Sequence, residues 1–110
     1  MTERAERIVR NEILFREVNE QVDALHAAIS PTGTFPIVCE CGSGTCSEAI
    51  MIEATDYQAV RAHPERFVVV SGHQIKDVED VLEEHGTFAV VAKKPGAPRR
   101  LAVTTDPRRS

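Results

Sequence analysis

Three cysteines within eight residues constrain this chain more than any other feature of its sequence. Cys39, Cys41 and Cys46 follow a C-x-C-x4-C spacing, and an odd number of thiols cannot all pair as disulfides. On a strand, residues i and i+2 project to the same side, so Cys39 and Cys41 can face one ion. Gly42 and Gly44 give the following loop the freedom to return Cys46 to that point. Clustered cysteines of this kind indicate a metal site or thiol redox chemistry.

Zinc is the ion that such a cluster favours. Thiolate sulfurs bind zinc in tetrahedral geometry, and three of them leave one position for a fourth ligand. Of the four histidines, His73 directly follows a β-branched run and a glycine, where a rigid strand can fix a ligand. We therefore predict four Zn²⁺ ligands, namely Cys39, Cys41, Cys46 and His73. His85 and a water molecule are the alternatives for the fourth position, and redox chemistry without a metal is the alternative to the site itself.

A long amphipathic helix is predicted from about Thr2, as the N-cap, to Ile29. The segment 30–33, which contains Pro31 and Gly33, ends it. The apolar stripe is broad, which favours packing on a sheet over a narrow coiled-coil seam, although a homodimer through this helix stays open. The stripe consists of Ile8, Leu14, Phe15, Val18, Val22, Leu25, Ala28 and Ile29.

Short apolar runs predict strands at residues 37–41, 49–53, 67–71 and 88–92. A capping-box pattern beginning at Thr55 predicts a short helix to about Ala62. Residues 77–84 fit one face of either a helix or a strand. The Pro-Gly-Ala-Pro sequence at residues 95–98 predicts a basic, flexible tail over residues 95–110, with a short strand at 101–103.

These elements predict one α+β domain over residues 1–94. The long helix packs on a small, mostly antiparallel sheet that carries a zinc knuckle, and the length of 110 residues suits a single domain. The predicted core consists of Leu14, Val18, Val22, Leu25, Ile37, Ile50, Ile52, Phe67, Val69, Val90 and Val91.

The chain resembles a group of small uncharacterised bacterial proteins, mainly actinobacterial. The resemblance covers nearly the whole chain to about Lys93, and it implies that the cysteines and a downstream Gly-His pair, Gly72-His73, act as one constellation. It implies no activity. The stretches that carry it are residues 14–20, 39–41, 46–48, 57–61 and 66–73.

Composition argues against several classes of partner. The chain has no tryptophan and one tyrosine, so it offers few rings on which bases could stack. Residues 1–92 carry 7 Lys/Arg and 16 Asp/Glu, whereas residues 93–110 carry 6 and one. The acidic body should repel nucleic acid. The charged N-terminus is not followed by an apolar run, which predicts no membrane span and a cytoplasmic location.

The sequence favours a non-enzymatic module. The H-E-x-x-H, P-C-x-x-C, G-x-S-x-G and Walker motifs are all absent. We predict a protein-interaction or regulatory domain with structural zinc and a protein partner. A redox-sensitive zinc–thiolate switch and a zinc-dependent enzyme with an open coordination position are the alternatives. Glu40 and Glu48 flank the cysteines, and we interpret them as solvated acidic residues.

Overall fold

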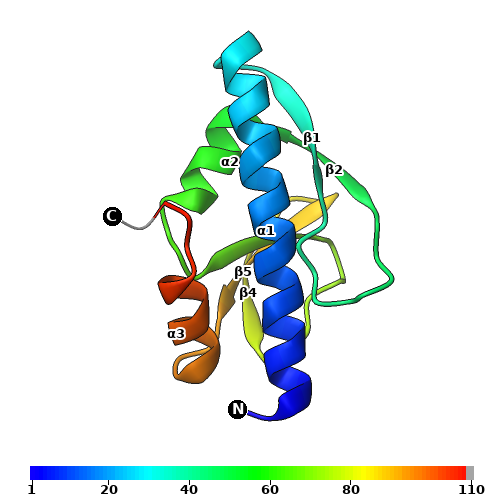
Figure 1. Cartoon of the computed structure of the whole chain (residues 1–110). Coiled ribbons are helices and arrows are strands. Elements are labelled where there is room, and N and C mark those ends of the chain that lie inside the picture. The colour runs from blue at the N-terminus through cyan, green and yellow to red at the C-terminus, as the bar shows by residue number, and fades with distance from the viewer. Residues whose placement is uncertain (109–110) are drawn as a thin grey trace.

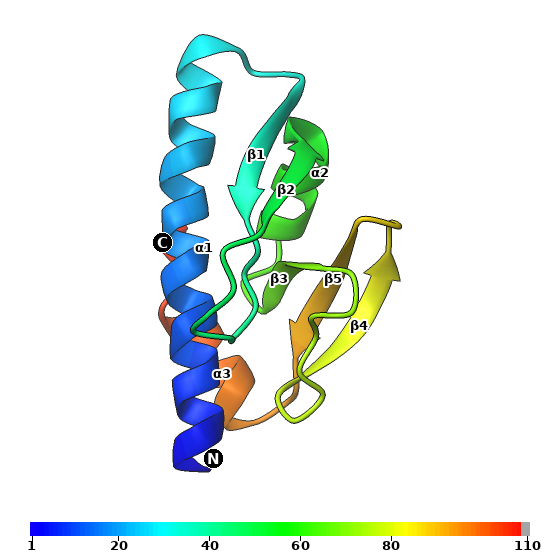
Figure 2. The same cartoon turned by 90° about the vertical axis from the view of Figure 1, so that its right-hand side faces the viewer.

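The computed structural model describes residues 1–108, which form an α+β fold as predicted (Figure 1). The strands make an antiparallel pair, β1-β2, and an antiparallel three-stranded sheet of order β3-β5-β4. Figure 2 shows α1 along one side of both sheets. In chain order the elements are α1 Glu3–Ile29, β1 Thr34–Val38, β2 Ala49–Glu53, α2 Ala54–Arg61, β3 Arg66–Val70, β4 Glu79–Glu84, β5 Phe88–Lys93 and α3 Ala97–Thr104.

Helix α1 has the predicted ends and a different buried face. The Thr2 hydroxyl accepts a hydrogen bond from the Ala5 N–H at 3.0 Å, which confirms the N-cap. The prediction that Leu14, Val18 and Leu25 belong to the core is wrong, because their exposed fractions are 56%, 39% and 70%. Val22 is partly buried. The helix instead buries Ile8, Val9, Glu12, Arg16 and Asn19.

Backbone partners explain why polar side chains of α1 face inward. Asn19 donates to the Val38 carbonyl and accepts from the Val38 N–H, both at 2.8 Å, so its amide pairs with β1 as a strand would. Arg16 donates to the carbonyls of Pro64 at 2.7 Å and Ala102 at 2.9 Å. Burying a polar group costs little free energy when the group has a hydrogen-bond partner. These contacts therefore determine which face of α1 packs inward.

The remaining predicted core residues are confirmed. Phe35 pairs with Ile52 and Ile37 with Ile50 across β1 and β2, which points all four side chains to the buried side. The β-branched run of β3 is buried along with its partner β5. The confirmed residues, each no more than 3% exposed, are Ile37, Ile50, Ile52, Phe67, Val69, Val90 and Val91.

Three local expectations change. Strand β1 spans Thr34–Val38 rather than the predicted residues 37–41, so Cys39 and Cys41 follow the strand instead of lying on it. The short helix α2 begins at Ala54 with Glu53 as its N-cap, so Thr55 does not cap it. Residues 77–84, which the sequence left undecided, contain strand β4. Val81 and Leu82 of this strand are 42% and 47% exposed.

The expectation of an irregular tail with a strand at 101–103 is wrong, because residues 97–104 form α3. A proline in the first turn of a helix gives up an N–H that would have no partner, so Pro98 fits the first turn of α3 and does not break the helix. Ala102 is fully buried, and Arg108 donates to Glu20 of α1 at 2.8 Å. Both Figures 1 and 2 show α3 beside the N-terminal half of α1. Residues 109–110 of the expected tail lie outside the described residues.

None of the helices over residues 1–108 combines the length and apolar character that a membrane span requires.

Candidate metal centre

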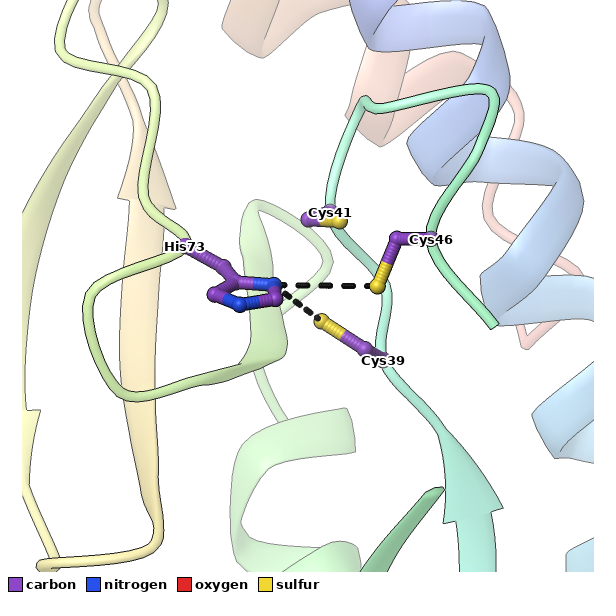
Figure 3. A group of neighbouring side chains, drawn as sticks. All are labelled: Cys39, Cys41, Cys46 and His73. Atoms are coloured by element: carbon purple, nitrogen blue, oxygen red, sulfur yellow. Dashed lines mark hydrogen bonds between the residues drawn. The ribbon is translucent and has the colours of Figure 1, made fainter. Parts of the chain in front are cut away.

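The three cysteines and His73 converge from two separate connections. Cys39 directly follows β1, Cys41 and Cys46 lie on the loop to β2, and His73 lies on the connection between β3 and β4. Figure 3 shows the four side chains pointing toward one another. The His73 Nδ1 atom is 3.7 Å from the Cys39 Sγ and 3.6 Å from the Cys46 Sγ. All four candidate ligand atoms lie within 4.8 Å of one another.

These separations suit a tetrahedral metal site. Metal–sulfur bonds of about 2.3 Å and a metal–nitrogen bond of about 2.0 Å place a sulfur and a nitrogen about 3.5 Å apart around a tetrahedron. The two distances from His73 Nδ1 to sulfur are 3.6 and 3.7 Å. The four residues could therefore hold a metal ion with small side-chain adjustments.

Backbone hydrogen bonds on both sides fix the segment that carries the first two cysteines. The Cys39 N–H donates to the Glu48 carbonyl, which extends the β1-β2 hairpin, and the Glu40 N–H donates to the Val68 carbonyl of β3, both at 2.9 Å. The Glu40 carboxylate accepts from the Val68 N–H at 2.9 Å. The Val70 N–H donates to the Cys39 Sγ at 3.1 Å. Hence this segment joins the two sheets, and a backbone donor is already directed at one sulfur.

The loop between Cys41 and Cys46 requires a glycine where it approaches α1. A Cβ atom on Gly42 would lie 2.2 Å from the Cγ2 of Ile8. The Asn11 amide donates to the Gly42 carbonyl at 3.2 Å, which anchors the loop to α1. Gly44 has open space around it, so among these two glycines only Gly42 is needed for close approach.

Burial keeps the two inner thiols protonated in the absence of a metal. Cys39 and Cys41 are each 1% exposed, and desolvation raises the pKa of both thiols above the ordinary value. The hydrogen bond from the Val70 N–H works in the opposite direction on the pKa of Cys39. A metal ion that binds here must displace these protons, so binding should release protons to solvent.

Glu48 holds the imidazole of His73 from its far side. The His73 Nε2 atom is 3.0 Å from a Glu48 carboxylate oxygen, and its Nδ1 atom faces the sulfurs. A carboxylate at Nε2 places the proton there and leaves the Nδ1 lone pair free for a metal. Sequence reasoning missed this role, although Glu48 lies two residues beyond Cys46.

Glu40, unlike the exposed Glu48, is not the solvated residue that was expected. Its side chain is fully buried and accepts a hydrogen bond from Asn19 at 2.8 Å in addition to the one from Val68. Its carboxylate is therefore used to pack the Cys39–Cys41 segment against α1 and β3.

The alternative fourth ligand, His85, is engaged elsewhere. Its Nε2 atom is 2.9 Å from a Glu83 carboxylate oxygen, and its ring stacks on Phe88 with centroids 4.7 Å apart. The candidate cluster that the described residues form contains His73 and not His85.

Comparison with protein-family models, with curated proteins and with solved structures gives no match to this chain. The inference of function therefore starts from the geometry of the cysteine–histidine cluster.

Proposed function

We propose that this chain is a small zinc-binding domain with a structural role for the ion. The observation that supports it is the convergence of three cysteine sulfurs and the His73 Nδ1 within 4.8 Å. A mixed sulfur and nitrogen set of this kind favours zinc among the common divalent metals. In this proposal, zinc ties the loop between β1 and β2 to the connection after β3.

Four protein ligands argue for a structural rather than a catalytic ion. A catalytic zinc keeps one position for water, whereas a structural site is closed. Three thiolates and one neutral imidazole give the complex a net charge of −1, which weakens zinc as a Lewis acid. The domain then acts in the cytoplasm as a non-enzymatic interaction or regulatory module that recognises another protein.

One observation favours a redox-sensitive zinc–thiolate switch as the second candidate. Cys46 is partly exposed, whereas Cys39 and Cys41 are buried. An oxidant such as peroxide would therefore reach the Cys46 sulfur first. One hydrogen peroxide would oxidise two thiolates to a disulfide, take up two protons from solvent to become two water molecules, and thereby release the zinc.

Metal content measured by mass spectrometry on untagged protein tests the proposal. We expect about one zinc per chain in the wild type. His73→Ala should lose it, and the matched His85→Ala control should keep it. A wild type without metal, purified under reducing conditions and without chelator, would overturn the proposal. Zinc that mild peroxide releases and a reductant restores would favour the switch over a purely structural ion.

The role of Glu48 makes a second prediction. Glu48→Ala should weaken zinc affinity by about 10- to 100-fold, because the imidazole loses the group that orients it. Glu17→Ala on the exposed face of α1 is the matched control and should bind as the wild type does. The measurement is competition with a chromophoric chelator. Equal affinities of Glu48→Ala and wild type would show that the carboxylate does not position His73.

A further inference from the structure

Helix α1 turns an apolar face to solvent. The exposed fractions of Leu14, Val18, Leu25 and Ile29 are 56%, 39%, 70% and 87%. Between Leu14 and Ile29, the exposed positions of the helix carry one charged side chain, that of Glu17. A helix that only met water would carry its polar residues on this face. The arrangement is typical of an interaction surface.

The exposed stripe has the spacing of a coiled-coil seam. Leu14, Val18, Gln21, Leu25 and Ala28 are separated alternately by four and three residues, and all five are exposed. The first four of these positions are separated by four, three and four residues, a spacing that reads the same in both directions along the helix. A second copy in antiparallel orientation therefore matches it, with Leu14 opposite Leu25 and Val18 opposite Gln21 of the other copy.

Charge complementarity favours the same orientation. Arg7 and Arg10 are exposed one to two turns before the stripe. In this register they lie beside the C-terminal end of α1 in the other copy, where unpaired carbonyls carry partial negative charge. The last turn of α1 contains only His26 as a basic residue. Arginines from a second copy would supply the positive charge that this end accommodates.

We propose that α1 is the interface of an antiparallel homodimer, in which two copies meet along residues 14–25. Twofold symmetry makes each contact twice, so the Leu14–Leu25 contact occurs at both ends of the seam. The metal cluster approaches α1 from the other side, where Gly42 packs on Ile8. Dimerisation is thus separable from the proposed zinc binding.

Sedimentation equilibrium of the full chain, from about 1 to 200 µM, tests the proposal. We expect a concentration-dependent dimer. Leu25→Glu should raise the dissociation constant by about 100-fold, because it places a charge in two layers of the seam. Met51→Glu is the matched control, since Met51 is 58% exposed on β2 and should leave the dimer intact. Both variants should keep the wild-type zinc content and circular dichroism.

A charge pair tests the orientation. Val18→Glu alone should give a monomer, and adding Gln21→Arg to the same chain should restore dimerisation to within about tenfold of the wild type. In a parallel pair the like charges would face each other, and the double variant would stay monomeric. That result would overturn the antiparallel register. The dimer proposal would be overturned if the wild type were monomeric over the whole concentration range, or if Leu25→Glu were as dimeric as the wild type. The exposed face of α1 would then be assigned to binding a different protein.

Discussion

Cys46→Ala is expected to lose its zinc and about 3 to 4 kcal/mol of stability, because an ion that binds only the folded chain stabilises it by this amount at 100 to 1,000 times its dissociation constant. For a domain of this size the midpoint of thermal unfolding should fall by more than about 10 °C. The measurements are metal analysis and thermal unfolding followed by circular dichroism. Unchanged metal content and midpoint would refute the proposed ligand role of Cys46.

A chelator separates loss of metal from loss of packing. Wild-type protein stripped of metal should unfold at about the temperature of Cys46→Ala, whereas the variant itself should not respond to the chelator. Cys46 is the least buried of the three cysteines, so its replacement disturbs the core least. A variant much less stable than stripped wild type would assign the effect to packing instead.

The loss should be partial rather than complete, since the core does not depend on the ion. The β3-β5 pair and the inner face of the hairpin are buried by contacts with other apolar side chains. The ion would add a link between the β1-β2 loop, whose Glu40 N–H already donates to the Val68 carbonyl of β3, and the connection that follows β3. This differs from a zinc finger, which has little other core and unfolds without metal.

The sequence predicted the strands at 49–53, 67–71 and 88–92 to within one residue, and it placed His73 beside the cysteines, because both predictions depend on local chemistry. Alternating apolar residues specified the inner faces of β1 and β2, and the β-branched run specified β3. His73 was singled out because it ends that run, and the structure places it against Cys39 and Cys46.

The orientation of α1 could not be read from its periodicity. Apolar spacing finds a stripe, but it does not say whether the stripe packs inside the chain or against another molecule. Which face of α1 packs inward depends on hydrogen-bond partners far along the sequence, since Asn19 donates to the Val38 carbonyl and Arg16 to the Ala102 carbonyl. Glu48 was missed for the same reason, because its target His73 is not a sequence neighbour.

A buried ionic cluster lies where α1, β4 and β5 meet. Glu12, Glu79 and Lys93 have fully buried side chains, and the Lys93 Nζ is 2.8 Å from a Glu12 carboxylate oxygen and bonded to Glu79. The same Nζ lies 4.4 Å from the centroid of the Phe67 ring. The Ile75 N–H donates to the Glu79 carboxylate at 2.9 Å. This cluster is one of the polar sets that the sequence did not predict.

The pKa values of the two carboxyl groups of this cluster are shifted in opposite directions. Burial raises the pKa of Glu12 well above its ordinary value, against the attraction of Lys93. Burial also acts to raise the pKa of Glu79, but the hydrogen bond with Glu12 and the charge of Lys93 outweigh it and the pKa falls. We therefore expect Glu12 to keep a proton more readily than Glu79, with Glu79 as the counter-ion of Lys93.

Matched glutamine substitutions should separate these roles. Glu79→Gln leaves the Lys93 ammonium buried without a counter-ion, and we expect a loss of about 3 to 5 kcal/mol in the free energy of unfolding at pH 7. Glu12→Gln keeps a neutral group that can accept from Lys93 and donate to Glu79, so its cost should stay below about 1 kcal/mol. Urea unfolding measures both. Equal costs would mean that the two carboxyls share the proton, and a larger cost for Glu12→Gln would reverse the assignment.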